Sequence, residues 1–127
     1  MEAKAYIKNI RISPKKLRFL LQEIKKAKPA DVLHSLEYSP KKGAKIFYNA
    51  IKSALTNAKN NLKVDEESLV FKTLTVEEGR KLKRYRPGAR GTAKPYGKRY
   101  SHIKVILKVQ EPKKEIKQNV KSSEDKK

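Results

Sequence analysis

Residues 79–101 read GRKLKRYRPGARGTAKPYGKRYS and hold nine cations and no acidic residue. The stretch also contains four glycines and two prolines, but only Leu82 and three tyrosines could be buried. A structureless loop of this length is uncommon inside a compact domain. We therefore predict that the two flanking strands continue as a long hairpin, here called the arm, with its tip near 87–91. At about 3.3 Å per residue, each side of the arm reaches roughly 30 Å.

The charge of the whole chain is concentrated around the arm. The chain has 127 residues and a formal net charge of +20. Residues 79–110 carry 11 basic and no acidic side chains, whereas residues 1–78 carry 16 and 9, and residues 111–127 carry 6 and 4. Such a block repels itself until phosphates bind to it. The alternative, a lysine-rich solvated face, usually has glutamates interspersed. The pattern indicates a polyanionic partner, which we expect to order an arm that lacks a core.

The composition argues against several other classes of protein. The chain has no Cys, which excludes disulfides and thiolate zinc sites. No apolar run approaches the roughly 20 residues of a membrane helix, and the charged N-terminus does not resemble a signal peptide. We expect a protein of a reducing compartment without a membrane partner.

Catalytic signals are weak as well. His34 and His102 are the only histidines, and the acidic run 65–67 falls in a predicted loop. Gly88 and Gly91 do not have the spacing of a phosphate-binding loop. The sequence predicts no catalytic residue, no metal site and no cofactor.

Strand-like patterns flank the arm and open the chain. Residues 69–78 are rich in Val, Phe, Thr and Leu, and residues 102–110 alternate between apolar and polar side chains. Residues 3–12 predict a further strand, whose alternation changes phase near Asn9 as at a β-bulge. The sequence therefore predicts three strands.

Helical periodicity lies between the first and second strands. The pair Ser13-Pro14 predicts a helix start, with Ser as N-cap and Pro in the first turn. We place Lys25, Lys26 and Lys28 in the last turn of this helix, where cations suit the dipole. A short second helix is predicted over Pro29–Glu37.

The third predicted helix is the longest. It begins at Ser39-Pro40, runs to about Asn60, and has an apolar stripe rich in alanine, so another element can approach it closely. We predict one domain over 1–112 that includes the arm, followed by a lysine-rich disordered tail over 113–127.

Two Ser-Pro-Lys-Lys segments, 13–16 and 39–42, place lysines at predicted helix starts. The helix dipole and the free amide groups there favour anions. Lys15, Lys16 and Arg18 make sense at such a position if a phosphate binds beside them. The alternative is that Ser caps the helix, Pro begins it, and the lysines are only solvated. Neither alternative is excluded by the sequence.

Three tyrosines, Tyr85, Tyr96 and Tyr100, are interleaved with the cations of the arm. Aromatic rings among cations can stack on exposed bases. The rings can instead pack across the hairpin as ordinary cross-strand pairs. Packing is at least as well supported for Tyr100, which adjoins the last predicted strand.

Taken together, residues 3–110 closely resemble the L twenty-two family of large-subunit ribosomal proteins in its bacterial form. The matching residues are Arg11, Ser13, Lys16 and Arg18; Ser53, Ala54, Asn57, Ala58 and Asn61; Glu78 and Gly79; Lys83, Arg84, Pro87, Ala89, Gly91 and Ala93; and Lys98, Arg99, Ser101, His102 and Ile103.

The resemblance implies an α+β fold, with three helices packed on a small three-stranded antiparallel sheet and a long protruding β-hairpin. It implies a structural protein of the cytoplasmic large ribosomal subunit that binds 23S-type rRNA and supports subunit assembly. The hairpin tip would lie in the wall of the nascent-polypeptide exit tunnel, with the globular part near the tunnel exit. The implied partners are rRNA, neighbouring large-subunit proteins and the nascent polypeptide, with the chain present as a monomer.

The charge pattern and the resemblance together select the candidate rRNA-binding residues. These are Arg11, Ser13, Lys15, Lys16, Arg18, Lys41, Lys42, Arg80, Lys81, Lys83, Arg84, Arg86, Arg90, Lys94, Lys98, Arg99 and His102. The candidate tunnel-lining tip consists of Arg86, Pro87, Gly88, Ala89, Arg90, Gly91 and Thr92. The family often has basic residues at positions 88 and 92, so the resemblance implies fewer phosphate contacts at this tip.

Two other classes of function are alternatives to an rRNA-binding protein. Ser-Pro-Lys-Lys also resembles repeats of linker-histone tails, which suggests a DNA-compacting protein. Here, however, each segment opens a predicted amphipathic helix instead of lying in a disordered tail. A small enzyme acting on RNA would need clustered acid–base or metal-binding residues, which the sequence does not offer.

Overall fold

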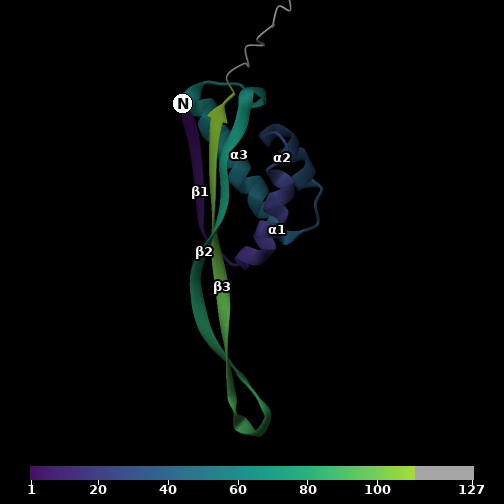
Figure 1. Cartoon of the computed structure of the whole chain (residues 1–127), viewed down its shortest axis with the longest axis vertical. Coiled ribbons are helices and arrows are strands. Elements are labelled where there is room, and N and C mark those ends of the chain that lie inside the picture. The colour runs from purple at the N-terminus through teal and green to yellow at the C-terminus, as the bar shows by residue number, and fades with distance from the viewer. Residues whose placement is uncertain (111–127) are drawn as a thin grey trace, which may run out of the picture.

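A computed structural model describes residues 1–110, so the predicted tail over 113–127 lies outside the described residues. The elements are β1 (Glu2–Ile10), α1 (Pro14–Ile24), α2 (Pro29–Glu37), α3 (Lys42–Leu62), a 3-10 turn (Glu66–Ser68), β2 (Leu69–Pro87), a second 3-10 turn (Ala89–Gly91) and β3 (Ala93–Val109). The strands form an antiparallel sheet in the order β1-β3-β2. Three helices cover one face of it, and β2 and β3 continue beyond them as a hairpin (Figure 1). The α+β architecture predicted from the sequence is confirmed.

Strand β3 is the central strand because it pairs with β1 along one edge and with β2 along the other. Ile103, Val105 and Leu107 are fully buried. Val105 lies opposite Ala5 of β1 on one side and Leu74 of β2 on the other. Alternation along the strand directs these side chains to the helices and leaves the lysines on the other face.

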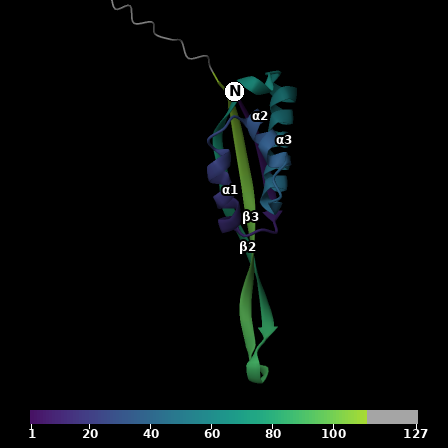
Figure 2. The same cartoon turned by 90° about the vertical axis from the view of Figure 1, so that its right-hand side faces the viewer.

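Helix α3 packs closely on the sheet because its inner stripe is small. Ala44, Ala50, Ala54 and Ala58 are all completely buried. With only a methyl group at each position, the helix axis can lie near β1, as the two views show (Figures 1 and 2). The Asn57 side-chain amide donates a hydrogen bond to the Lys4 carbonyl oxygen at 3.1 Å. This bond ties the helix to the edge strand.

The predicted start of α1 at Ser13-Pro14 is confirmed, but two details of the prediction are wrong. Ser13 occupies the N-cap position, but its side chain makes no capping hydrogen bond; its carbonyl oxygen instead accepts the amide of Lys16 at 3.1 Å. The helix ends at Ile24, so the lysines at 25, 26 and 28 do not lie in its last turn. Lys28 is extended because it precedes Pro29, and the helical region is disfavoured before proline.

The third helix begins at Lys42, with Lys41 as N-cap, and not at Ser39-Pro40. The Ser39 amide donates to the Leu36 carbonyl oxygen at 3.3 Å, so Ser39 closes the preceding helix. Gly43 lies in the first turn of α3 against α1. A Cβ there would stand 2.6 Å from the Leu20 Cδ1 atom. Gly43 therefore lets the first turn of α3 lie close to α1, a contact that local sequence does not record.

Irregular pairing marks the neck, where the sheet becomes the arm. The predicted bulge in β1 is confirmed: the register shifts between Ile7 and Ile10, and Asn9 has φ +57°. A second shift lies between Glu78 and Lys81 of β2. Bulges increase local twist and redirect a strand. The neck is further fixed by buried Ser101, whose hydroxyl donates to the Ile12 carbonyl oxygen at 2.9 Å.

Replacing the ring at the centre of the core tests this packing. Phe47 is fully buried, so Phe47→Ala should lower the free energy of unfolding by about 3–5 kcal/mol. Phe19 is 65% exposed, and the matched Phe19→Ala variant should change it by less than about 0.5 kcal/mol. Chemical denaturation measures both. Equal losses would show that Phe47 is not the centre of the core.

Candidate nucleic-acid interface

The arm is the hairpin that the sequence predicted. Residue pairs run from Lys81↔Arg99 to Pro87↔Ala93. Between Glu78 and Pro87 it extends about 30 Å at about 3.3 Å per residue. Beyond Tyr100, which is buried, the side chains of β3 in the arm are exposed. The arm is thus held by backbone pairing and not by a core.

Repulsion between cations weakens the pairing of β2 with β3 in the arm. Lys81 lies directly opposite Arg99, and Arg86 directly opposite Lys94. Like charges facing each other across antiparallel strands are destabilising. An anion placed between such pairs would relieve the repulsion.

Among the described residues, the ion pairs lie outside the arm. Arg18 pairs with Glu78 at 3.7 Å, Lys41 pairs with Glu23 at 3.8 Å, and Lys72 pairs with Glu2. None involves a cation of residues 79–101 within this part of the chain. Since these cations have no carboxylate partner there, their charge is available to a ligand.

The tip is a tight turn that depends on two glycines. The Gly88 amide donates to the Thr92 carbonyl oxygen at 2.7 Å, and a Cβ on Gly88 would lie 2.9 Å from that oxygen. Gly91 has φ +69°, and its neighbour Arg90 also has a positive φ, of 54°. Gly88 and Gly91 are therefore needed for the backbone conformation of the turn itself.

The three tyrosines of the arm have different environments. Tyr100 is 7% exposed and lies beneath the Arg80 guanidinium, 5.3 Å from it, so it packs as part of the structure. Tyr96 is 39% exposed, and the Arg86 guanidinium stacks over its ring at 4.7 Å. Tyr85 is 69% exposed. The packing alternative holds for Tyr100, whereas the other two rings remain accessible.

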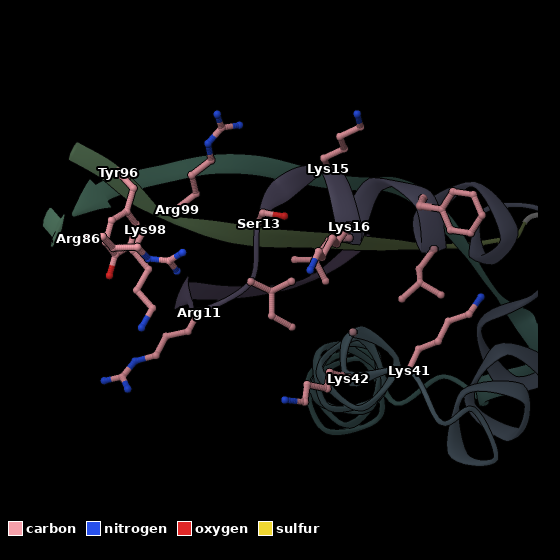
Figure 3. A pocket seen from close by; sticks show the side chains of 16 residues that line it. Arg11, Ser13, Lys15, Lys16, Lys41, Lys42, Arg86, Tyr96, Lys98 and Arg99 are labelled. Atoms are coloured by element: carbon pink, nitrogen blue, oxygen red, sulfur yellow. The ribbon is translucent and has the colours of Figure 1, made fainter. Parts of the chain in front are cut away.

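A groove of about 880 Å³ lies where the arm meets the starts of α1 and α3. Its lining contains cations from both Ser-Pro-Lys-Lys segments, from the turn after β1 and from the arm, and it contains no Asp or Glu. These cations are Arg11, Lys15, Lys16, Lys41, Lys42, Arg86, Lys98 and Arg99. In Figure 3, Arg11, Arg86 and Lys98 lie on the arm side, and Lys16 and Lys42 lie at the helices. We call this feature the neck groove.

The two helix starts in the neck groove have no side-chain caps. Their first amide groups and the positive ends of their dipoles face the same region as the lysines. This arrangement is electrostatically unfavourable for a lysine alone and favourable for a lysine beside an anion. The groove can therefore accept phosphate groups.

The structure thus divides the candidate residues into three sets. Arg11, Ser13, Lys15, Lys16, Lys41, Lys42, Arg86, Lys98 and Arg99 line the neck groove. Arg80, Lys81, Lys83, Arg84, Arg90 and Lys94 lie along the rest of the arm and its tip. Arg18 and His102 lie apart from both sets.

Arg18 and His102 are engaged within the protein. Besides its ion pair with Glu78, Arg18 donates to the Val76 carbonyl oxygen at 3.4 Å. His102 accepts the Asn9 amide at Nδ1 at 2.9 Å. Both residues therefore help to hold the neck, a role that spacing along the sequence did not indicate.

Sequence reasoning missed the apolar part of the neck groove. Phe19 is 65% exposed and lines the groove beside Lys41, whose ammonium lies 5.5 Å from the ring centre. The available signal was its position: Phe19 falls outside the apolar stripe of α1. A large aromatic residue on a polar helix face is a candidate contact residue.

Two shifted pKa values occur on the sheet face away from the helices. A hydrogen bond from the Tyr6 hydroxyl to Glu77, at 2.9 Å, raises the pKa of Tyr6. A hydrogen bond from Lys72 lowers the pKa of the Glu2 carboxyl group. Both contacts join β1 to β2 across β3, and neither belongs to the neck groove.

Within residues 1–110, no helix is long and apolar enough to span a membrane. The same residues contain no group of three or more His, Cys, Asp or Glu side chains that could hold a metal ion.

The fold and its surfaces define a small basic α+β protein with an extended hairpin and surfaces suited to polyanions. The family described as Ribosomal protein L22p/L17e matches residues 5–108, and the chain belongs to that family. It is 46% identical over 111 residues to the large ribosomal subunit protein uL22 of Akkermansia muciniphila, covering 87% of this chain and 99% of that protein. It is 41% identical over 116 residues to uL22 of Fervidobacterium nodosum, covering 91% and 79% respectively.

Family membership confirms the resemblance seen in the sequence. The chain is a structural protein of the large ribosomal subunit and not an enzyme, and as a component of that subunit it is cytoplasmic.

Salt should change the stability of the arm more than that of the body. Raising the salt concentration from about 0.01 M to about 1 M shortens the Debye length from about 30 Å to about 3 Å. Because this screens the like-charge pairs, amide hydrogen exchange should slow in 81–86 and 94–99. Amides of 103–107 in the body serve as the internal control. Equal responses of arm and body would contradict the role of cross-strand repulsion.

Proposed function

We propose that the protein binds 23S-type rRNA and thereby supports assembly of the large subunit. The arm runs between rRNA segments, its tip lies in the wall of the nascent-polypeptide exit tunnel, and the globular part lies near the tunnel exit. Neighbouring large-subunit proteins contact the globular part, and the nascent polypeptide passes the tip. The protein acts as a monomer within the subunit.

The observation that carries this proposal is that the arm, residues 79–101, contains nine cations and no carboxylate. It reaches about 30 Å from the body and holds like-charge pairs such as Lys81↔Arg99. Such a structure is unfavourable in water and favourable among converging phosphates. Contacts with the sugar-phosphate backbone position a protein on nucleic acid. Dense packing against rRNA would thus replace the hydrophobic core that the arm lacks.

The geometry of the tip supports its proposed place in the tunnel wall. It is narrow, since the chain reverses between Pro87 and Ala93. Its turn is closed by the hydrogen bond between Gly88 and Thr92. Arg86, just before this turn, and Arg90, within it, are both exposed. A tip of this form can pass between rRNA segments while its arginines contact phosphates.

Competition binding tests the proposed function. The full-length protein should bind 23S-type rRNA in the presence of excess duplex DNA, and should retain part of that binding as salt rises. Each neutralised phosphate contributes roughly −0.9 to the log–log salt slope in duplex DNA and somewhat less in single strands. Equal competition by DNA, with complete loss at raised salt, would support a DNA-compacting polycation instead.

A triple substitution tests the role of the arm. Replacing Arg84, Arg86 and Arg90 with Gln should reduce the salt slope of rRNA binding by up to about 3. The melting temperature of the free protein should barely change, because these side chains are exposed. Isothermal binding assays and thermal denaturation measure the two effects.

The matched control removes the same charge from helix α3. Lys45, Lys52 and Lys59 are exposed there, and their replacement with Gln should leave rRNA binding closer to that of the wild type. A large loss of folding stability in the arm variant would show that the arm belongs to the core.

A further inference from the structure

The lining of the neck groove combines cations with aromatic side chains from α1 and from the arm. Phe19 and Tyr96 line it and are 65% and 39% exposed. Half-buried Ile12 adds apolar surface to the lining, whereas Leu17 and Leu20 are buried beneath it. Cations beside exposed aromatic rings are a recognition pattern for a ligand that is both anionic and flat.

The shape of the neck groove favours a single strand over a duplex. A duplex presents a convex surface of phosphates and sugars, which would leave the aromatic rings in contact with water. A single strand can enter a concave site and insert a base that has left its stack. The volume of about 880 Å³ lies in the range of pockets that enclose small organic ligands, about 300–1,000 Å³. There is room for an unpaired nucleotide.

A stacking platform is already assembled on the arm side of the neck groove. The Arg86 guanidinium lies 4.7 Å from the centre of the Tyr96 ring, and Figure 3 shows both side chains beside Lys98. Both residues are exposed. Nucleobases stack on aromatic rings and on guanidinium planes in the same way. A base on this pair would lie close to the cations that receive its phosphates.

We propose that the neck groove binds an unpaired nucleotide of large-subunit rRNA, with the base on Tyr96 and Arg86. The adjacent phosphates lie between Arg11 and Lys98 on the arm side and Lys16 and Lys42 on the helix side. This proposal rests on the proposed function, since the RNA is the one that the arm binds. It gives the groove a role in selecting a particular rRNA conformation, which the arm's charge alone does not provide.

Paired tyrosine variants test the base contact in the full-length protein bound to transcribed 23S-type rRNA. Tyr96→Leu removes the ring and should weaken binding roughly 5- to 150-fold, as expected for the loss of one stacked base. Tyr96→Phe keeps the ring and should restore the affinity. Tyr85→Leu is the matched control, because Tyr85 is an exposed arm tyrosine outside the groove lining.

Base-specific chemical probing provides a second readout. The wild-type protein should protect at least one unpaired rRNA base, and Tyr96→Leu should expose it while the remaining footprint persists. Protection of the sugar-phosphate backbone alone, or equal losses in Tyr96→Leu and Tyr85→Leu, would overturn the proposal and indicate duplex binding at the groove.

The two proposals fail in distinguishable ways. If the wild-type protein binds duplex DNA as well as rRNA, the proposed function fails. If binding is specific for rRNA but Tyr96→Leu behaves like Tyr85→Leu, only the nucleotide site fails.

Discussion

The antiparallel pairing of β3 with β2 is the interaction on which the rest of the structure depends. In the body, β3 also pairs with β1 and buries Ile103, Val105 and Leu107 beneath the helices. Beyond the neck it pairs with β2 alone. The hydrophobic effect therefore stabilises one half of the strand directly. The other half is stabilised only as a continuation of the first, so the bulges and buried Ser101 at the neck set its direction.

The arm illustrates a conflict between stability in isolation and binding. Its facing cations weaken the hairpin that carries them, yet they are the groups that a phosphate backbone would neutralise in the proposed complex with rRNA. Added carboxylates would stabilise the free arm and compete with the ligand for its cations. The ion pairs described here instead lie in the body, as at Arg18 and Glu78. Under the proposed function, the charges that repel one another in the free protein are the same charges that bind the rRNA.

Much of the fold was predictable because it is recorded in short-range patterns. Alternation predicted the strands over 3–12 and 102–110, and a content of Val, Phe, Thr and Leu predicted the strand over 69–78. The 3–4 residue spacing of apolar side chains predicted the helices, and α2 has the predicted bounds of Pro29–Glu37. The start of α3 was not predicted correctly, because the Ser39 amide bonds back to Leu36 and ends the preceding helix. Likewise, the roles of Arg18 and His102 depend on partners across the neck, which are distant in sequence.

The sequence by itself determined the arm and its charge, because a run of cations without apolar residues can neither form a core nor remain neutral. It also determined the family, because the matching residues are spread over 3–110. Only the tertiary structure decided what the two Ser-Pro-Lys-Lys segments do. The packing of α1 against α3 and the twist at the neck bring them to the same groove as Lys98 and Tyr96. Packing geometry of this kind is determined by contacts between distant segments, whereas periodicity and charge are properties of neighbouring residues.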